Sequence, residues 1–231
     1  NRTTCKAPLD KEKGSVLWTA DADDKFGAVV SNFGTAESPL IVDNKVICTP
    51  TGQTATMVAY DKITGELIWQ SKSIGGKKSY MSPILYAYKD RRYILNGTDS
   101  HIFAVSPDDG EIVWMYDHYD ISRERNNDEW GKCIINSLVY KDDEILITRG
   151  YDYPAIMLKV DSTGGAVQEK WVNPTLDNEH GGVVLVNNYI YGANYGNNAK
   201  WVCLDWDTGE VTFLQKWNGS GSIVAADGML Y

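Results

Sequence analysis

The chain has 231 residues, of which 43% are hydrophobic and 23% are charged, and its formal net charge is −9 at pH 7. This composition is typical of a globular protein with a sizeable core, and its 8 Trp and 14 Tyr residues argue against disorder. The acidic balance argues against a nucleic-acid partner, because phosphate binding needs clustered Lys and Arg. The longest apolar runs have the length of strands, so we expect no transmembrane segment.

One short unit recurs along the chain. It consists of an apolar run, an acidic or hydroxyl residue, a Gly four positions later and an aromatic residue four positions after that. A weak copy begins the chain, and a looser one has its aromatic residue two positions late. In chain order the copies are Asp10, Gly14, Trp18; Asp61, Gly65, Trp69; Ser106, Gly110, Trp114; Asp161, Gly165, Trp171; and Asp205, Gly209, Phe213.

A second landmark, Ser-Pro or a related pair, precedes each full unit. The landmarks begin at residues 38, 82, 137, 182 and 222, so their spacings are 44, 55, 45 and 40 residues. Periods of this size are typical of propeller blades or of helical arrays. Segments such as 45–49 and 189–191 are β-branched or aromatic and too short for helices. The sequence therefore predicts an all-β propeller whose blades are four-stranded antiparallel sheets.

Four blades are complete in this prediction, over 38–70, 82–115, 137–172 and 182–214. Residues 5–19 supply two strands of a preceding blade, and the C-terminal residues supply the first strand and the start of the second strand of a following one. We treat 1–231 as a single propeller. Two arrangements stay open. The chain is a fragment of a seven- or eight-bladed ring, which we favour, or its terminal halves join to close a five-bladed ring.

The recurring residues suit a turn followed by a docking side chain. The acidic residue accepts backbone N–H groups, Gly supplies a positive φ, and the aromatic ring packs on a neighbouring blade. The pattern Ala-x-Asp-x-x-Thr-Gly-x-x-x-Trp resembles the tryptophan-docking motif of the PQQ-like β-propellers, the superfamily of quinoprotein alcohol dehydrogenases. The resemblance covers nearly the whole chain. Residues 176–184 and 201–205 are similar to a bacterial secreted branch of that superfamily, which implies a periplasmic or secreted protein.

In such propellers the functional residues usually lie where the first strand of each blade begins, so we expect a site there. The connections 19–37 and 115–136 are long and could carry a binding face, although solvated loops are the structural alternative. The candidates are of two kinds. The catalytic candidates are His180, Glu37 and Asp177. The ligand-binding candidates are Tyr80, Asn136, Trp130, His118, Arg123, Arg125 and Glu179.

The resemblance to quinoprotein dehydrogenases implies PQQ, a calcium ion, a catalytic Asp and, often, a disulfide between adjacent cysteines. The cysteines here stand at 5, 48, 133 and 203, so no adjacent pair exists, and we expect mostly buried thiols with the pairing left open. The three histidines have no metal-ligand spacing, and no metal site is predicted.

Two functions from different classes follow. The favoured one is a non-catalytic extracytoplasmic binding or scaffold module for a protein or glycan, with outer-membrane association by analogy to an assembly lipoprotein of this fold. The alternative is a PQQ- and calcium-dependent oxidoreductase acting on an alcohol or sugar. A sugar-active lyase or hydrolase that uses aromatic side chains for stacking is a weaker third.

Overall fold

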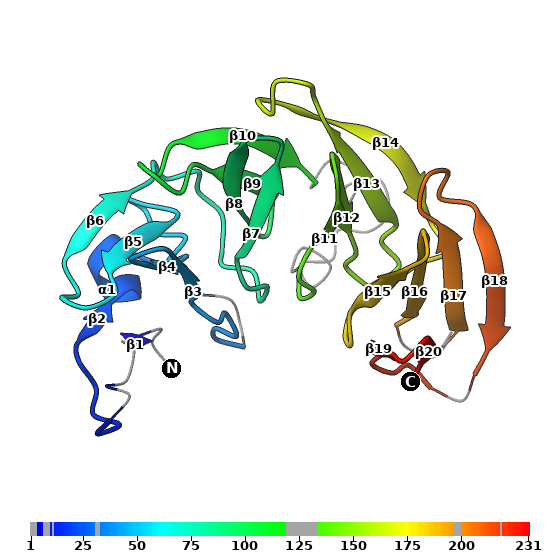
Figure 1. The fold of residues 1–231 in the computed structure, drawn as a ribbon, viewed down its shortest axis with the longest axis horizontal. Helices are drawn as coiled ribbons and strands as arrows, with labels where there is room; N and C mark the ends of the chain where they lie inside the picture. The colour runs from blue at the N-terminus through cyan, green and yellow to red at the C-terminus, as the bar shows by residue number, and fades with distance from the viewer. Residues whose placement is uncertain are drawn as a thin grey trace. The chain divides into compact units, whose positions relative to one another are not determined.

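The computed structural model describes residues 4–6, 10, 12–30, 33–118, 134–195, 200–217 and 219–231 (Figure 1). The described residues form four four-stranded antiparallel sheets and two two-stranded ones. This confirms the predicted all-β fold built from four-stranded propeller blades. The chain divides into two compact units, Asn1–His118 and Tyr119–Tyr231. No helix in the described ranges is long and apolar enough to cross a bilayer.

The first unit contains two blades and a preceding strand pair. The pair is β1 (Thr4–Lys6) and β2 (Thr19–Asp21), and a short helix, α1 (Ala22–Phe26), follows it. The first blade consists of β3 (Leu40–Val42), β4 (Lys45–Cys48), β5 (Val58–Asp61) and β6 (Leu67–Gln70). The second blade consists of β7 (Ile84–Tyr88), β8 (Arg91–Gly97), β9 (His101–Val105) and β10 (Ile112–Asp117).

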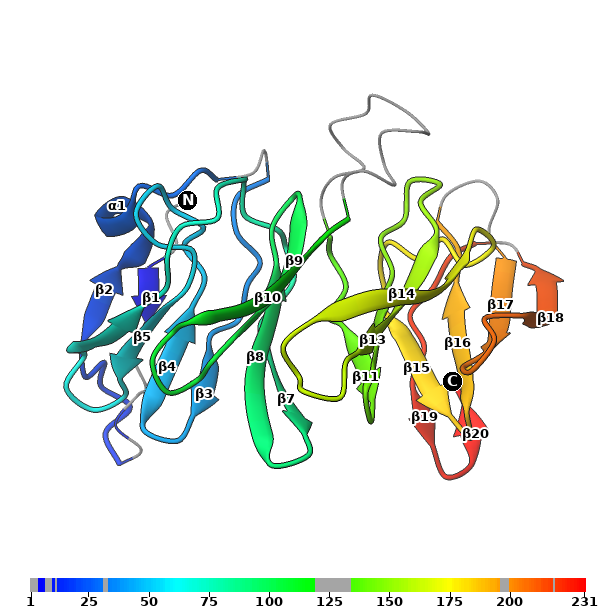
Figure 2. The same ribbon diagram turned by 90° about the horizontal axis from the view of Figure 1, so that it is seen from above.

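The second unit repeats this plan, and in each blade the strands pair in chain order (Figure 2). The third blade consists of β11 (Val139–Lys141), β12 (Glu144–Ile147), β13 (Ala155–Val160) and β14 (Val167–Asn173). The fourth consists of β15 (Val183–Val186), β16 (Tyr189–Ala193), β17 (Lys200–Asp205) and β18 (Val211–Lys216). A final hairpin joins β19 (Ala225–Ala226) to β20 (Met229–Leu230).

Two-residue turns set the register of the first hairpin of each blade. Val42 pairs with Lys45 and Val186 with Tyr189, which leaves two residues in each turn. The first turn residue has a positive φ in both cases, 54° at Asp43 and 49° at Asn187. Asp and Asn tolerate this conformation, and such turns match the twist of the flanking strands. The register then keeps the apolar side chains on the buried faces.

The recurring acidic residue organises the turn between the third and fourth strands. The Asp61 carboxylate accepts the N–H groups of Ile63 and Thr64 at 2.8 and 2.9 Å. Gly65 closes the turn with a φ of 76°, and its N–H donates to the Asp61 carbonyl at 2.9 Å. Asp205 and Gly209 repeat this arrangement. At the third turn, however, the positive φ of 75° falls on Gly164, and Gly165 instead donates to the Asp161 carboxylate.

The recurring Trp packs on the Gly of the next blade within each unit. The indole N–H groups of Trp18, Trp69 and Trp171 donate to the carbonyls of Lys62, Pro107 and Trp206, at 3.2, 3.1 and 2.9 Å. Each indole lies over a turn glycine so closely that an added Cβ would stand 2.5 or 2.6 Å from the ring; these glycines are Gly65, Gly110 and Gly209. Only a residue without a side chain fits at that point.

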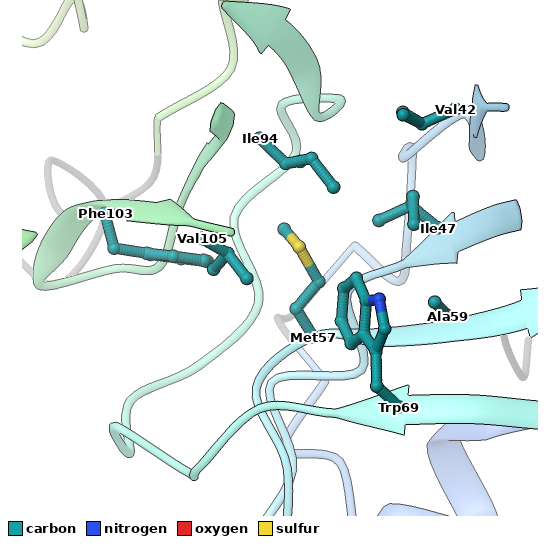
Figure 3. Packing of buried hydrophobic residues seen from close by; sticks show 8 residues of the cluster. All are labelled: Val42, Ile47, Met57, Ala59, Trp69, Ile94, Phe103 and Val105. Carbon is teal, nitrogen blue, oxygen red and sulfur yellow. The ribbon is translucent and has the colours of Figure 1, made fainter. Parts of the chain in front are cut away.

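The small residue two positions before the acidic or hydroxyl residue leaves room for the indole within its own blade. Ala59 pairs directly with Trp69, and the strand register shifts beside this pair. Figure 3 shows the Trp69 ring between Met57 and Ala59, in a buried cluster that also contains Ile47 and Phe103. Trp114 is buried and pairs with Ala104 in the same way. The aromatic residue of the fourth blade, Phe213, is half exposed.

The cysteines differ from the expectation of mostly buried thiols. Cys48, at the end of β4, is disulfide-bonded, whereas Cys203 on β17 is a free buried thiol. Cys133 lies outside the described residues. Spacing alone gave no basis for this assignment, because four cysteines allow several pairings.

Trp206, which follows the acidic residue of the fourth docking turn, joins the third and fourth blades. Its side chain is fully buried, and its indole N–H donates to the carboxylate of Glu144 on β12. Lys170 on β14 pairs with the same carboxylate. The Glu144 charge is therefore both hydrogen-bonded and neutralised, as a buried charge requires.

We predict that Trp206→Ala lowers the free energy of unfolding by about 3–5 kcal/mol, because it leaves a cavity and removes a hydrogen bond from a buried carboxylate. Urea denaturation followed by circular dichroism measures the change. Trp217→Ala is the matched control, since Trp217 is 62% exposed, and it should change stability by less than about 0.5 kcal/mol. Equal effects of the two substitutions would contradict the assignment.

Candidate functional site

The first unit contains a buried group of charges next to the start of β3. Lys78 Nζ lies 3.0 Å from Asp23 Oδ1 and 3.8 Å from Glu37 Oε2, and all three side chains are almost entirely buried. Asp23 stands in the first turn of α1, which Asp21 caps at one end and the left-handed Gly27 ends at the other. The backbone of Lys78 forms an isolated antiparallel β-bridge with Thr98. Three separate segments of chain therefore meet at one lysine.

Glu37 is the unusual member of this group. Burial raises its pKa from 4.5 to about 7, against the opposing effects of Lys78 and of hydrogen bonds from Thr49. Its Oε1 atom is buried and has no hydrogen-bond partner. Asn96 on β8 donates to the Thr49 hydroxyl at 2.7 Å, so the second blade supports the residue that binds Glu37. A carboxyl group with this pKa can hold or release a proton near neutral pH.

Two other predicted residues of the first unit have structural partners. The hydroxyl of Tyr80 accepts the backbone N–H of Phe33 at 3.2 Å, and the two rings are in contact. His118 is fully buried, with its Nε2 atom 3.2 Å from the Thr98 carbonyl. Both positions are consistent with packing.

The second unit brings four of the predicted residues together just before β15. Asp177, Glu179 and His180 lie on one short segment, and His180 Nδ1 is 2.9 Å from Glu179 Oε2. Asn136 is buried and donates to the Asn178 side chain at 2.6 Å and to the Thr148 hydroxyl at 3.1 Å. The side-chain amide of Asn136, which precedes the third blade, thus fixes the segment around Asn178 that leads into the fourth blade.

Hydrogen bonds on both sides of the peptide backbone fix Asp177. Its backbone carbonyl accepts the N–H of Tyr195 at 2.6 Å, and its own N–H donates to Asn194. The rings of Tyr195 and Tyr151 have centroids 4.8 Å apart, and the His180 ring lies 6.5 Å from that of Tyr195. Burial, followed by the charges of Asp152 and Glu179, raises the pKa of Asp177 to about 6.

Sequence reasoning found part of these groups and missed the rest. Trp130, Arg123 and Arg125 lie outside the described residues. Lys78 and Tyr195 were not predicted, although Lys78 stands in a connection that leads into a blade and Tyr195 follows a strand end. Position within the repeat was the available signal, and it identifies strand ends without saying which polar groups meet there.

These blades and docking turns define a PQQ-like β-propeller repeat protein. The chain belongs to the family described as outer membrane protein assembly factor BamB, whose profile matches residues 7–228. The predicted resemblance is confirmed. Among curated proteins none matches the sequence.

Several solved structures share the fold. BamB from Moraxella catarrhalis is 17% identical with a TM-score of 0.58, over 98% of this chain and 68% of that one. Sqt1 from Saccharomyces cerevisiae is 14% identical with a TM-score of 0.61, over 96% and 60%. A europium-containing methanol dehydrogenase is 14% identical with a TM-score of 0.54, over 90% and 47%. This chain thus spans from about half to two thirds of these proteins, and the identities show the fold alone.

The buried charge group around Lys78 does not fit PQQ. PQQ is a tricarboxylate, so its site needs unpaired cations or N–H donors. In the first unit the buried cation Lys78 is already engaged, because it pairs with the carboxylates of Asp23 and Glu37. The unpartnered buried atom beside Lys78 is a carboxylate oxygen of Glu37, which would repel the cofactor when ionised. In the described parts of the chain, no three His, Cys, Asp or Glu side chains are grouped to hold a metal ion.

We predict that Glu37 makes stability depend on pH. Its pKa is raised on folding, so the stabilisation is complete below about pH 4.5 and is lost as pH rises through 7. The shift corresponds to about 3 kcal/mol. Glu37→Gln removes this dependence, so wild type should lose about that much stability relative to the variant between pH 4.5 and 8, measured by urea denaturation. Glu66→Gln, at an exposed position, is the control. Parallel pH profiles for wild type and Glu37→Gln would contradict the assignment.

Proposed function

We propose that this protein is an extracytoplasmic binding module that holds a protein partner at the outer membrane. The observation that carries the proposal is the family match over residues 7–228, whose description is an outer membrane protein assembly factor. The fold is consistent with such a role, because repeated blades present many strand ends and loops on a rigid framework.

The disulfide at Cys48 supports an extracytoplasmic location. Disulfides form and persist in oxidising compartments such as the bacterial periplasm, and they are rare in the cytosol. We therefore include the predicted periplasmic or secreted location in this proposal. The partner class is protein, in keeping with the family description, and no feature of the described residues favours a glycan.

The oxidoreductase alternative has weaker support. Methanol dehydrogenase shares the fold, but a fold hosts unrelated functions, and function has to be argued from the site. The buried charge group around Lys78 offers an unpartnered carboxylate oxygen of Glu37, which disfavours a tricarboxylate cofactor there. We therefore derive no oxidation step for this chain.

Binding of the purified outer-membrane assembly complex of the source organism to this immobilised chain, by interferometry, tests the proposal. We expect saturable binding with a Kd in the micromolar range or tighter, because the interaction must survive dilution in the periplasm. An unrelated propeller of similar size and charge is the control. Binding no stronger than to the control would contradict the proposal. PQQ-dependent dye reduction with an alcohol would contradict it as well and would favour the alternative.

A further inference from the structure

We propose that a groove on the fourth blade binds an extended segment of the protein partner, which carries apolar side chains at alternate positions and pairs with β20 as a third strand. The inference rests on the proposed function for the identity of the partner. The groove has a volume of about 630 Å³, and its walls come from the fourth blade and from the β19–β20 hairpin. These walls include Tyr191, Trp201, Cys203, Phe213, Ile223 and Leu230, and we call the site the fourth-blade groove.

The groove lies on the face by which the first and third blades pack against the blade that follows them. Cys203 on β17 pairs with Tyr191 on β16 and with Phe213 on β18. The corresponding rows of the first and third blades are Ile47, Ala59, Trp69 and Leu146, Met157, Trp171. Both of these rows pack in buried clusters that also contain side chains of the next blade. The fourth-blade groove therefore continues a blade-to-blade interface that this chain forms twice.

The chain itself shows what such a row of side chains accepts. The row of the first blade clusters with Phe103 and Val105, which are alternate residues of β9 in the second blade. The row of the third blade clusters with Val202 and Leu204, which are alternate residues of β17 in the fourth blade. In each case these side chains come from the third strand of the next blade. An extended strand with apolar side chains at alternate positions therefore fits this face.

The hairpin beside the fourth blade supplies only part of that cover. Both ribbon views place β19 and β20 next to the fourth blade (Figures 1 and 2), and Ile223 and Leu230 line the groove from this side. In the described part of the chain β19 and β20 form a two-stranded sheet, so no third strand lies beside β20 there. Phe213 is accordingly 50% exposed, whereas its counterpart Trp69 is 7% exposed. The groove is thus accessible where the first and third blades are covered by a third strand.

The outer edge of β20 has the backbone groups that a further strand needs. Val224 and Tyr231 exchange two backbone hydrogen bonds, at 3.0 and 2.9 Å. Leu230, one residue earlier, pairs with Ala225, and alternate pairs of an antiparallel ladder are not hydrogen-bonded to each other. The N–H and C=O groups of Leu230 therefore point away from β19. Edge groups of this kind are those that an added strand binds.

The chemistry of the groove favours an apolar strand. None of the described residues that line it has a charged side chain, so an ionic group that faced it would lose its hydration without a partner in return. Phe213 also differs from the Trp of the other rows because it has no N–H group. Trp69 and Trp171 donate to carbonyls of the next docking turn, whereas Phe213 needs no such acceptor. A strand without a docking turn can therefore cover this face.

Binding of a fluorescent synthetic peptide to the full chain, followed by fluorescence anisotropy, tests the proposal. The probe has the sequence of residues 100–106, which contain β9, the strand that clusters with the docking row of the first blade. The control peptide has Thr in place of the Phe and the Val, which keeps its charge and its preference for an extended conformation. We expect the probe to bind with a Kd of about 100 μM or tighter, and the control at least about tenfold more weakly. Equal binding of the two peptides, or no binding of the probe, would overturn the proposal.

A surface substitution locates the binding. Phe213→Ser should weaken binding of the probe about tenfold, because it removes an apolar wall of the groove. Leu214→Ser is the matched control, since Leu214 is the next residue of β18, is 46% exposed and does not line the groove. Both side chains are half exposed, so both variants should fold. Unchanged binding by Phe213→Ser, or an equal loss with Leu214→Ser, would overturn the proposal.

A second pair of variants tests whether the bound segment pairs as a strand. Leu230→Ala removes the side chain and keeps the N–H group at the outer edge of β20, whereas Leu230→Pro removes both. The N–H of Leu230 points away from β19, so the hydrogen bonds between Val224 and Tyr231 should persist in both variants. We expect Leu230→Pro to bind the probe at least about threefold more weakly than Leu230→Ala does. Equal binding by the two variants would overturn the strand pairing.

Sedimentation velocity separates a partner strand from a second copy of this chain. We expect wild type to sediment as a monomer at micromolar concentration. A dimer that Phe213→Ser abolishes would make the groove an interface between copies and would overturn the proposal.

The Phe213→Ser variant also separates this inference from the proposed function. If it binds the assembly complex as tightly as wild type does, the groove is not the site of partner binding, and the proposed function still stands. If the peptide probe binds while wild type fails to bind the assembly complex, the groove stands as a site for apolar strands and the proposed function fails.

Discussion

The contact of an indole on one blade with the bare backbone of a glycine on the next is the interaction on which the rest depends. Trp69 can donate to the Pro107 carbonyl only because Gly110 has no side chain. The same holds for Trp18 on Gly65 and for Trp171 on Gly209. Burial of an indole contributes more than the hydrogen bond, but the hydrogen bond fixes where the ring lies. The docking contact therefore sets the spacing of neighbouring blades.

The candidate sites depend on that spacing because they are assembled from more than one blade. Glu37 precedes the first blade, whereas Asn96, which supports it through Thr49, belongs to the second. In the second unit Asn136 precedes the third blade and binds Asn178, which leads into the fourth. A small change in blade spacing would break these hydrogen bonds and leave buried polar groups without partners, which is strongly destabilising.

The sequence predicted the blades well because each depends on local rules. One tight turn requires Asp61 and Gly65. Asp43 and Asn187 likewise favour two-residue hairpin turns, because they tolerate a positive φ. The groups of charges could not be predicted in this way. Whether Lys78 meets Glu37, or the Tyr195 N–H binds the Asp177 carbonyl, depends on how segments distant in the repeat pack, and a repeat pattern does not report that. Gly164 likewise takes the left-handed position because two adjacent glycines offered the turn a choice.

A double-mutant cycle on Trp69 and Gly110 tests the central claim most directly. Trp69→Leu, Gly110→Ala and the double variant are compared with wild type by urea denaturation. If the indole and the glycine act together, Gly110→Ala destabilises the Trp69→Leu protein less than it destabilises wild type, with a coupling energy of about 1–2 kcal/mol. Additive effects, with a coupling energy near zero, would show that Gly110 serves only its own turn and would contradict the account.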